Sequence, residues 1–337
     1  MKYLCLLLLA LLSGCGKSPD RAVLYCAQDM EYAQEILSSF EKETGIPVAT
    51  KFDTEANKSV SLFEELVQEA KRPRCDVFWN NEIINTIRLE RKGLLDRMEP
   101  DPNYPAWTRS ESGCWQAFAA RGRILIVNTE KLKEADYPKS ILDLTDPKWK
   151  SKLAMAKPQF GTTATHAACL FEVLGEEGAQ AFFNGLKVND ITILAGNKQV
   201  AERVARGDFA AGLTDTDDAI EEYNDKRPVK LLYLDQEAHP KYPALGTLFI
   251  PNTICILKNR PNPENAQKLV KFLLNPGTED KLALKGGFQI PLSTASQAKL
   301  HETLKRPDQV RRMEVSFEKS ADRWESVQQF LRDTFAR

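Results

Sequence analysis

Histidine, net charge and long apolar runs are all scarce in this chain of 337 residues. Its 46 Lys and Arg nearly balance 47 Asp and Glu, and the net charge of −1 excludes the basic footprint of a general nucleic-acid binder. Beyond the N-terminal region, no stretch approaches the roughly 20 apolar residues that a membrane-spanning helix needs. We therefore expect no nucleic-acid partner and no transmembrane helix in the body of the chain.

Motifs of metal and nucleophilic catalysis are also missing. The sequence has no C-x-x-C, H-E-x-x-H or G-x-S-x-G pattern, no EF-hand loop, and only three histidines, which are scattered. These absences argue against an enzyme, and a metal hydrolase built on carboxylates alone is the alternative. They also give no reason to expect a resident cofactor.

The N-terminus has the layout of a secretory signal. Lys2 precedes an apolar run over residues 4–12, and small residues lead to Cys15. The tetrapeptide LSGC at residues 12–15 resembles the lipobox of bacterial lipoproteins, which implies a signal peptide over residues 1–14 and a lipid on Cys15. Residues 15–21 would then form a polar tether, and the protein would lie outside the cytoplasm, anchored to a bacterial membrane and on its periplasmic side in a Gram-negative cell. The alternative is an ordinary cleaved signal in which Cys15 is incidental.

The number of remaining cysteines is odd. Five are left after Cys5 and Cys15 are set aside, so at least one has no disulfide partner within the chain. Small buried thiols are the simplest interpretation. The five are Cys26, Cys75, Cys114, Cys169 and Cys255.

Strand-like and helix-like segments alternate along the chain. Apolar, β-favouring runs alternate with amphipathic helical runs. This pattern predicts an α/β fold with parallel strands joined by crossover helices. The first five such segments are residues 22–27, 31–45, 46–52, 61–72 and 75–80. In segment 31–45, one helical face carries Tyr32, Ile36, Leu37 and Phe40, and Gly45 is expected to end the helix. Because no Pro/Gly/Ser-rich linker divides the chain, the lobes are expected to be discontinuous. The strand-like segments 123–128 and 253–258 are candidates for the places where the chain crosses between lobes.

Several segments carry a family resemblance. FEKETGIPV at 40–48, DVFWNNE at 76–82, DLTDPKWKSKLAMAKP at 143–158 and AGLTDTDDA at 211–219 look like the family 1 extracellular solute-binding proteins. More narrowly, the chain is similar to the ferric-iron-binding components of ABC importers, over residues 22 to about 295.

This resemblance implies a two-lobed, periplasmic-binding-protein-like (type II) fold with two crossover strands. Lobe 1 would comprise residues 22–122 plus 255–300, and lobe 2 residues 123–254 plus 301–337. It also implies a monomer that delivers a small solute to the permease and ATPase subunits of the importer.

Polar residues follow each of the first three predicted strands. The carboxyl ends of parallel strands form a natural ligand crevice, so these residues are ligand-binding candidates. For each of them, helix capping or solvation is the alternative, and Asp53 in particular could cap the helix that follows. The candidates are Gln28, Asp29, Asp53, Glu55, Asn80, Asn81 and Glu82.

Two further candidates come from the second half of the chain. In KPQFGTTATHAA, Thr162 and Thr163 stand where a strand gives way to a helix, and such a turn offers hydroxyls and N–H groups to an anion. A plain N-cap is the alternative. Arg121 precedes the crossover strand, where relatives often carry an anion-contacting arginine. It is expected either to bind a carboxylate or phosphate or to form a salt bridge.

The acidic segment TDTDDA differs from the ferric-binding relatives. Where they carry a tyrosine pair, this chain carries Asp217 and Asp218, with Asp215 close by. Hard oxygen ligands suit ferric iron or another hard cation, which makes Asp217 and Asp218 candidate metal ligands and Asp215 a further ligand-binding candidate. Ferric iron is then the preferred transported solute. The alternatives are helix capping and an anionic or zwitterionic organic solute, such as a phosphonate, a sugar phosphate or an amino-acid-like molecule. Whether Tyr25 or Tyr223 replaces a missing phenolate stays open.

Overall fold

The computed structural model describes residues 20–53, 60–99, 101–284 and 287–335. The predicted signal peptide, the lipidation residue Cys15, most of the tether and the candidate Glu55 lie outside the described residues. In the part that is described, no helix is long and apolar enough to cross a membrane.

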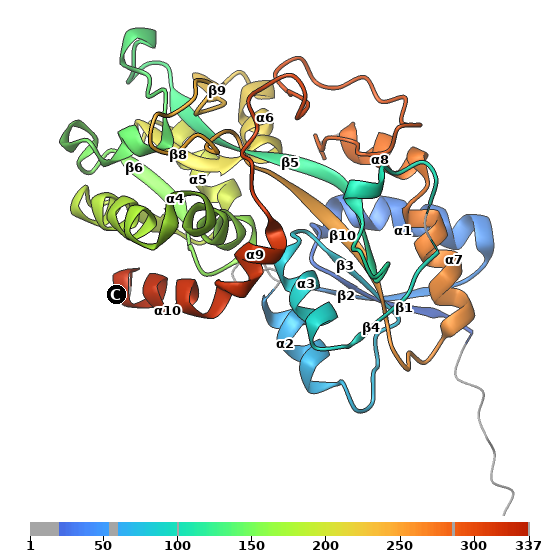
Figure 1. Cartoon of the computed structure of the whole chain (residues 1–337). Coiled ribbons are helices and arrows are strands. Elements are labelled where there is room, and N and C mark those ends of the chain that lie inside the picture. The colour runs from blue at the N-terminus through green and yellow to red at the C-terminus, as the bar shows by residue number, and fades with distance from the viewer. Residues whose placement is uncertain (1–19, 54–59, 100, 285–286, 336–337) are drawn as a thin grey trace, which may run out of the picture.

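Strands and helices alternate as the sequence predicted (Figure 1). The strands are β1 (Ala22–Cys26), β2 (Val48–Phe52), β3 (Val77–Asn80), β4 (Leu95–Asp96), β5 (Trp115–Asn128), β6 (Leu153–Ala156), β7 (Thr192–Leu194), β8 (Ala211–Asp215), β9 (Val229–Leu232) and β10 (Phe249–Leu257). The α-helices are α1 (Met30–Thr44), α2 (Val60–Gln68), α3 (Ile84–Arg91), α4 (Gly161–Val188), α5 (Asn197–Ala205), α6 (Thr216–Asn224), α7 (Pro263–Leu273), α8 (Pro276–Ala283), α9 (Phe317–Asp322) and α10 (Trp324–Phe335). Short 3₁₀ turns are η2 (Ala106–Thr108), η3 (Glu134–Asp136), η4 (Ile141–Thr145) and η5 (Pro147–Trp149).

One long strand, β5, belongs to both halves of the sheet. The strand order is β2-β1-β3-β10-β5-β8-β6-β7, with β4 on β10 and β9 on β5. Strand β1 is parallel to β2 and β3, and β6 is parallel to β7 and β8, as expected for segments joined by helices. Strands β5 and β10 run antiparallel to their neighbours. Two α/β lobes therefore share β5, with helices against both sets of parallel strands (Figure 1).

The crossing points lie upstream of the segments that the sequence suggested. Strand β5 pairs with β10 as far as Gly122 and with β8 from Arg123 onward. The segment 253–258 was expected to cross between lobes, but Thr253 already pairs with Asn80 of β3. The chain instead crosses at the start of β10, where the register with β5 shifts between Pro251 and Asn252. The residue ranges that the sequence predicted for the two lobes are approximate, and they remain a prediction.

Helix α1 illustrates how the local sequence sets an element. Its residues Ile36, Leu37 and Phe40 recur at helical spacing and are buried, which fixes the face that packs on the sheet. The helix ends at Gly45, whose φ of 71° is left-handed and whose N–H donates to the Glu41 carbonyl at 2.9 Å. The helix and its C-terminal stop are confirmed.

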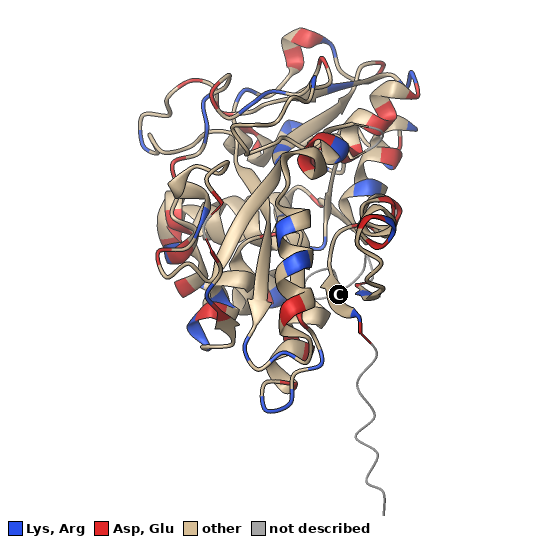
Figure 2. Cartoon of the chain, turned by 90° about the vertical axis from the view of Figure 1, so that its right-hand side faces the viewer, with Lys and Arg blue, Asp and Glu red and all other residues tan. Residues whose placement is uncertain are grey.

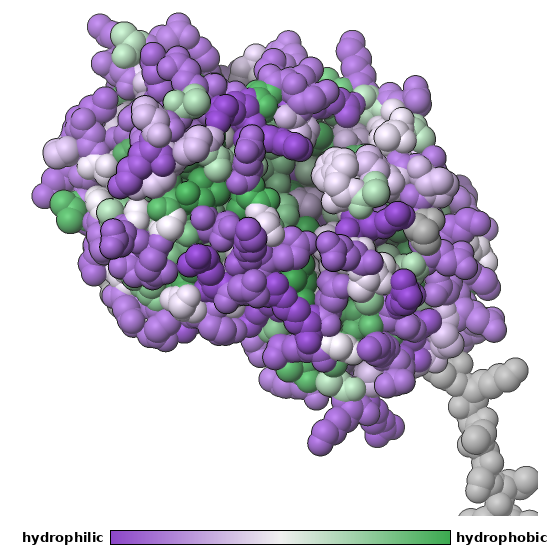
Figure 3. Space-filling view, viewed as in Figure 1, coloured by the Kyte–Doolittle hydropathy of each residue, from purple (hydrophilic) through white to green (hydrophobic). Residues whose placement is uncertain are grey.

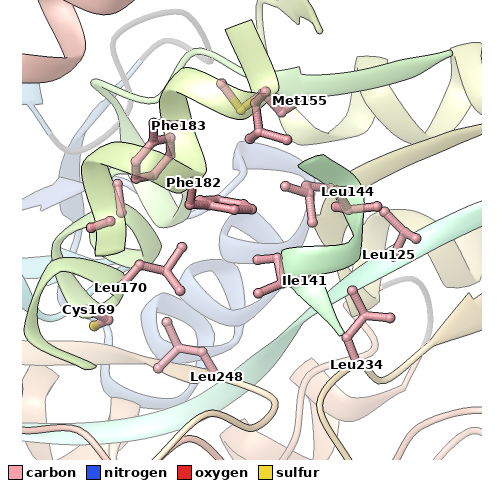
Figure 4. Close-up of a cluster of buried hydrophobic side chains, with 14 of the residues drawn as sticks. Leu125, Ile141, Leu144, Met155, Cys169, Leu170, Phe182, Phe183, Leu234 and Leu248 are labelled. Carbon is pink, nitrogen blue, oxygen red and sulfur yellow. The ribbon is translucent and has the colours of Figure 1, made fainter. Parts of the chain in front are cut away.

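Each lobe has its own apolar core. In lobe 2, Phe182 and Phe183 of α4 pack with Leu125 of β5 and Leu144 of η4 (Figure 4). In lobe 1, Trp79 is fully buried and its ring lies 5.4 Å from that of Phe118, so this tryptophan is part of the core. Charged residues gather on the peripheral helices and loops (Figure 2). In the space-filling view, apolar residues show between the lobes within a mostly hydrophilic surface (Figure 3).

Among the described residues, no disulfide joins any two of the five cysteines. Four are fully buried and Cys114 is partly buried, which confirms the interpretation as small buried side chains. Burial raises the pKa of the Cys169 thiol to about 12, so this thiol stays protonated and unreactive at neutral pH.

The C-terminal helices contact both lobes. Helix α9 packs on α3 of lobe 1 and on α4 of lobe 2, and α10 packs on α4. At this junction the Arg88 guanidinium lies 4.2 Å from the Phe63 ring centre and 5.1 Å from that of Trp324, and it bonds to Glu325 at 2.6 Å. The chain end thus forms a further link between lobes besides β5 and β10.

Candidate functional site

A polar cleft lies between the lobes, where the N-termini of four helices come together. Helix α1 reaches it from lobe 1, and helices α4, α5 and α6 reach it from lobe 2. About 690 Å³ of space lies between its walls, part of it open to solvent. The lining residues are Asp29, Glu31, Tyr32, Asn81, Arg121, Ala156, Lys157, Phe160, Gly161, Thr162, Thr163, Ala195, Gly196, Asn197, Lys198, Asp215, Asp217, Asp218 and Glu221.

Arg121 is the cation that connects the two lobes in this cleft. Its Nε donates to Asp217 Oδ2 at 3.0 Å, its Nη1 to the Asn81 carbonyl at 2.9 Å and its Nη2 to Gln28 Oε1 at 3.0 Å. Burial alone would lower the pKa of this guanidinium, but the carboxylates of Asp217 and Asp215 raise it, so the charge is retained. Arg121 therefore both lines the cleft and forms the salt bridge that was its alternative role.

Asp215 is engaged inside lobe 2. Its Oδ1 accepts from Arg123 Nη1 at 2.8 Å, and its Oδ2 accepts from Thr162 at 2.5 Å and from Asn197 Nδ2 at 3.0 Å. The side chains of Arg123 and Asp215 are 1% and 5% exposed. Asp215 stands at the N-cap position of α6, yet its carboxylate makes no capping bond there. Its partners organise the wall of the cleft and use the oxygens that a metal would need.

Asp217 and Asp218 stand in the first turn of α6. Together with Asp215 they can offer one oxygen each within 4.8 Å of one another. Asp215 has both carboxylate oxygens engaged inside lobe 2, whereas only Oδ2 of Asp217 accepts from Arg121. Asp217 and Asp218 are therefore better placed than Asp215 to meet a cation. Their position at a helix N-terminus also stabilises their negative charge.

The first turns of α4 and α5 have the opposite character. Neither contains an acidic residue, and Lys157 and Lys198 line the cleft beside them. Helix N-termini without a carboxylate of their own expose N–H groups that favour an anion. The Thr163 hydroxyl donates to Asn197 Oδ1 at 3.2 Å, which holds the two helix starts together. The cleft thus offers carboxylates from α1 and α6 and donors from α4 and α5.

Tyr32 and Lys198 tie the lobes together at the edge of the cleft. The Tyr32 hydroxyl of lobe 1 donates to Glu221 of lobe 2. Lys198 Nζ lies 3.5 Å from Glu31 of lobe 1 and 3.3 Å from Glu221. Burial and the hydrogen bond to Glu221 raise the pKa of Tyr32 well above its ordinary value, so its phenol stays protonated at neutral pH. Breaking these contacts is a requirement for opening the cleft.

Most of the predicted ligand-binding residues are brought to the cleft. Those that line it are Asp29, Asn81, Arg121, Thr162, Thr163, Asp215, Asp217 and Asp218. Gln28 lies directly behind Arg121. The capping alternative for the two threonines is wrong: the N-cap position of α4 is Phe160, and the hydroxyls of Thr162 and Thr163 bond to Asp215 and Asn197.

Besides Gln28, three predicted ligand-binding residues among those described, Asp53, Asn80 and Glu82, do not line the cleft. Asn80 is fully buried and donates to Glu82 at 2.8 Å, and Glu82 accepts from the N–H groups at the start of α3. Asp53 accepts from the Ser61 hydroxyl of α2. These polar residues at strand ends serve the neighbouring helices instead, because a buried polar group must find a partner close by.

Glu82 also has a role between the lobes. It is 1% exposed, and its Oε2 accepts from the Thr165 hydroxyl of α4 at 2.8 Å. Burial raises the pKa of this carboxyl, although four hydrogen bonds oppose the shift. Glu82 thus connects the start of α3 to the second lobe.

Tyr25 and Tyr223 do not reach the cleft either. The Tyr25 hydroxyl bonds to Glu65 and Glu69, and the Tyr223 hydroxyl bonds to Glu302. Tyr32 is the tyrosine that lines the cleft among the described residues. Neither of the two tyrosines that the sequence left open supplies a phenolate there.

Sequence reasoning missed the α5 side of the cleft and the residues that tie the lobes together at its edge. Asn197 and Lys198 follow β7 across the turn Ala195–Gly196, so they are also polar residues between a strand and a helix. That signal was present in the sequence, but β7 is a short strand and its segment was not singled out. Glu31 and Tyr32 follow the predicted Asp29 after Met30, whereas Glu221 lies on the second turn of α6 and has no local signal.

His166 gives the stability of lobe 2 a dependence on pH. Burial and the nearby Arg123 guanidinium hold the pKa of this imidazole well below 6.5. The His166 imidazole binds a proton more readily in the unfolded chain than in the native state. Its contribution to the free energy of unfolding is therefore complete above the unfolded-state pKa and is lost as the pH falls below that pKa. We expect His166 to contribute a loss of up to about 1.4 kcal/mol per pH unit below about pH 6.5.

Urea denaturation between pH 5 and 7.5 measures this contribution. In the variant His166→Gln, the free energy of unfolding should fall less steeply with decreasing pH than in the wild type. His239→Gln is the matched control, since His239 lies on a loop and is only partly buried. Equal pH slopes for wild type and His166→Gln would contradict the assignment of a neutral buried imidazole.

The fold and the cleft together define a two-lobed solute-binding protein of type II. A family model described as Bacterial extracellular solute-binding protein matches residues 76–315, more than half of the chain. The chain belongs to this family.

Relatives and solved structures agree with this assignment. The Fe(3+)-binding periplasmic protein of Serratia marcescens is 24% identical over 306 residues, 87% of this chain and 86% of the relative. The crystal structure of iron-bound HitA from Pseudomonas aeruginosa has a TM-score of 0.82 at 24% identity, covering 93% of this chain and 99% of the other. The periplasmic binding protein AfuA from Actinobacillus pleuropneumoniae, with exogenous fructose-6-phosphate bound, has a TM-score of 0.79 at 23% identity, covering 94% and 98%. The two structures support the type II fold.

Proposed function

We propose that this protein is the solute-binding component of an ABC importer and delivers a small hydrophilic solute to permease and ATPase subunits. It acts outside the cytoplasm, anchored by a lipid on Cys15, and it is a binder and not an enzyme. The family match and the periplasmic relatives support the transport role. The anchor rests on the segment LSGC alone.

The solute we favour is ferric iron or another hard cation, bound together with an anion. The observation that carries this choice is the composition of the cleft, where Asp217 and Asp218 face the same space as the acid-free N-termini of α4 and α5. Carboxylate oxygens suit a hard cation, and the helix N–H groups suit an accompanying anion. The iron-binding names of relatives point the same way.

An organic phosphate or phosphonate is the second candidate. It is favoured by Arg121, which already neutralises Asp217 at 3.0 Å and thereby weakens that carboxylate as a metal ligand. The amide nitrogen of Gln28, beside Arg121, is a buried donor with no acceptor among the described residues. An oxyanion suits such donors, and AfuA is a structural neighbour with a sugar phosphate bound.

Thermal unfolding of the mature protein with three probes distinguishes these solutes. The probes are ferric nitrilotriacetate, fructose 6-phosphate and inorganic phosphate. A ligand at 100 times its Kd stabilises the native state by about 2.7 kcal/mol, so a bound probe raises the Tm by a few degrees. On the iron proposal, ferric nitrilotriacetate shifts the Tm and the double variant Asp217→Asn with Asp218→Asn abolishes the shift.

Two further variants complete the test. Asp208→Asn is the matched control, because Asp208 pairs with Arg203 at the surface of lobe 2, and it should keep the full iron-induced shift. If only fructose 6-phosphate shifts the Tm and Arg121→Ala removes that shift, the cation proposal is wrong and the second candidate holds. If none of the three probes shifts the Tm, both candidate solutes are excluded.

A further inference from the structure

A chain of buried hydrogen bonds leads from the cleft to the strand that joins the lobes. Arg121 Nη2 and Gln289 Nε2 both donate to Gln28 Oε1, at 3.0 and 3.1 Å. Gln289 Oε1 in turn accepts from Asn252 Nδ2 at 2.7 Å, and Asn252 Nδ2 also donates to the Ala119 carbonyl at 2.7 Å. The four side chains are at most 3% exposed. Water therefore does not compete for these bonds.

The inner end of this chain is a strained point of the crossover strand. Ala119 has a φ of 40°, in the left-handed region that residues other than glycine seldom adopt. Its carbonyl is held by Asn252, and its N–H donates to Glu279 Oε1 at 2.6 Å. The register shift between β5 and β10 lies at Pro251 and Asn252, directly beside it. A backbone conformation of this kind persists only where its surroundings hold it in place.

The outer end of the chain faces the solute. Arg121 lines the cleft and pairs with Asp217, whereas Asn252 and Gln289 are not among the lining residues. The two amides belong to segments remote in sequence, β10 and the stretch after α8. Each side-chain oxygen in this series of hydrogen bonds accepts from a specific donor. Rotation of the Arg121 guanidinium therefore removes a hydrogen bond that Gln28 Oε1 accepts, and it disturbs the amide of Gln289, which donates to the same oxygen.

We propose that Gln28, Gln289 and Asn252 form a relay that positions Arg121 and couples solute in the cleft to the backbone at Ala119. The inference rests on the proposed function only in requiring that a solute binds in the cleft. A solute that engages Arg121 or Asp217 fixes the guanidinium in one orientation, and the relay passes this preference to the backbone at Ala119, beside the register shift where β10 enters lobe 1. The bound solute then shifts the population of lobe orientations through its differential affinity.

The test compares two buried asparagines. Asn252→Ala breaks the relay without removing any group from the cleft lining. Asn189→Ala is the matched control, because Asn189 is 2% exposed and its Nδ2 also donates to carbonyls, those of Leu144 and Asp146, within lobe 2. Gln289→Asn provides a second relay variant that keeps an amide but is too short to bridge its partners.

The first readout needs no solute. The Nε–H signal of Arg121 in the ¹⁵N NMR spectrum, assigned by its absence in Arg121→Lys, reports whether the guanidinium is held in one orientation. We expect Asn252→Ala and Gln289→Asn to broaden or shift this signal, although Arg121 donates its described hydrogen bonds to neither residue, and Asn189→Ala to leave it unchanged.

The second readout uses the probe that raises the Tm of the wild type. We expect the relay variants to bind that probe at least tenfold more weakly and to lose its protection of the peptide 116–124 against hydrogen exchange. Asn189→Ala should bind within twofold of the wild type and keep the protection. An unchanged Arg121 signal in both relay variants, or equal effects of Asn252→Ala and Asn189→Ala, would overturn the relay. If the Arg121 signal responds as expected while no probe binds the wild type, the relay stands and the candidate solutes fail.

Discussion

Replacing Asp215 by alanine is expected to lower the free energy of unfolding by about 3–5 kcal/mol. The reason is that Arg123 stays behind, buried and charged, after its carboxylate has gone. Thr162 and Asn197 lose the same acceptor, since both bond to Asp215 Oδ2. A buried charge without a partner costs far more than the pair contributes when intact, so this single change should be among the most harmful in the chain.

Urea denaturation measures this loss, with Asp208→Ala as the control. Asp208 also pairs with an arginine at 2.8 Å, but on the exposed surface, where removal of one partner should change stability little. The double variant Arg123→Leu with Asp215→Leu should recover much of the loss, because it removes both charges. Equal midpoints for Asp215→Ala and Asp208→Ala would refute the role of Asp215 as a structural anion.

Truncation of Phe183 to alanine is expected to cost a similar amount, about 3–5 kcal/mol. Its ring centre lies 5.1 Å from that of Phe182, 6.1 Å from Phe171, 6.4 Å from Phe330 and 6.3 Å from Phe335. The last two belong to α10, so a cavity here removes contacts that hold the C-terminal helix against α4. Loss of stability should therefore be accompanied by release of α10.

Two measurements test this expectation. Urea denaturation gives the loss of stability, and trypsin cleavage after Arg332 reports the release of α10. Phe183→Leu fills most of the space and should cost clearly less while leaving cleavage near the wild-type rate. A stable Phe183→Ala variant, or one that unfolds more easily without faster cleavage in α10, would show that the aromatic cluster does not secure this helix.

Local patterns predicted much of the fold. The alternation of strands and helices over residues 22–80 matches β1 to β3, and the apolar spacing in α1 identified its buried face. These predictions succeed because hydrophobic period and helix stops are properties of a few neighbouring residues. The crossing point in β10 was misplaced, because apolar residues there are buried in lobe 1 and carry no sign of which strand they pair with.

For the candidate site, the sequence predicted where residues lie better than it predicted what each residue does. Polar residues after strands and at helix starts were expected in the crevice, and Asp29, Arg121 and Asp217 do line it. Asn80 and Glu82 also follow a strand, but they do not line the cleft. Asn80 donates to Glu82, and Glu82 accepts from the start of α3 and from Thr165. Burial decides between these outcomes, and burial depends on packing between lobes that the local sequence does not encode.

The sequence by itself determined that this chain forms an α/β solute-binding protein with an acidic segment at the start of one helix. Only the tertiary structure decided that Asp215 is held by Arg123, 92 residues away, while Asp217 pairs with Arg121 in the cleft. It also decided that Gln28, Gln289 and Asn252 meet behind Arg121. The physical reason is that a buried polar group takes the partner that the register of distant strands brings to it, and a shift of one residue in that register would turn each side chain to the other face of the sheet.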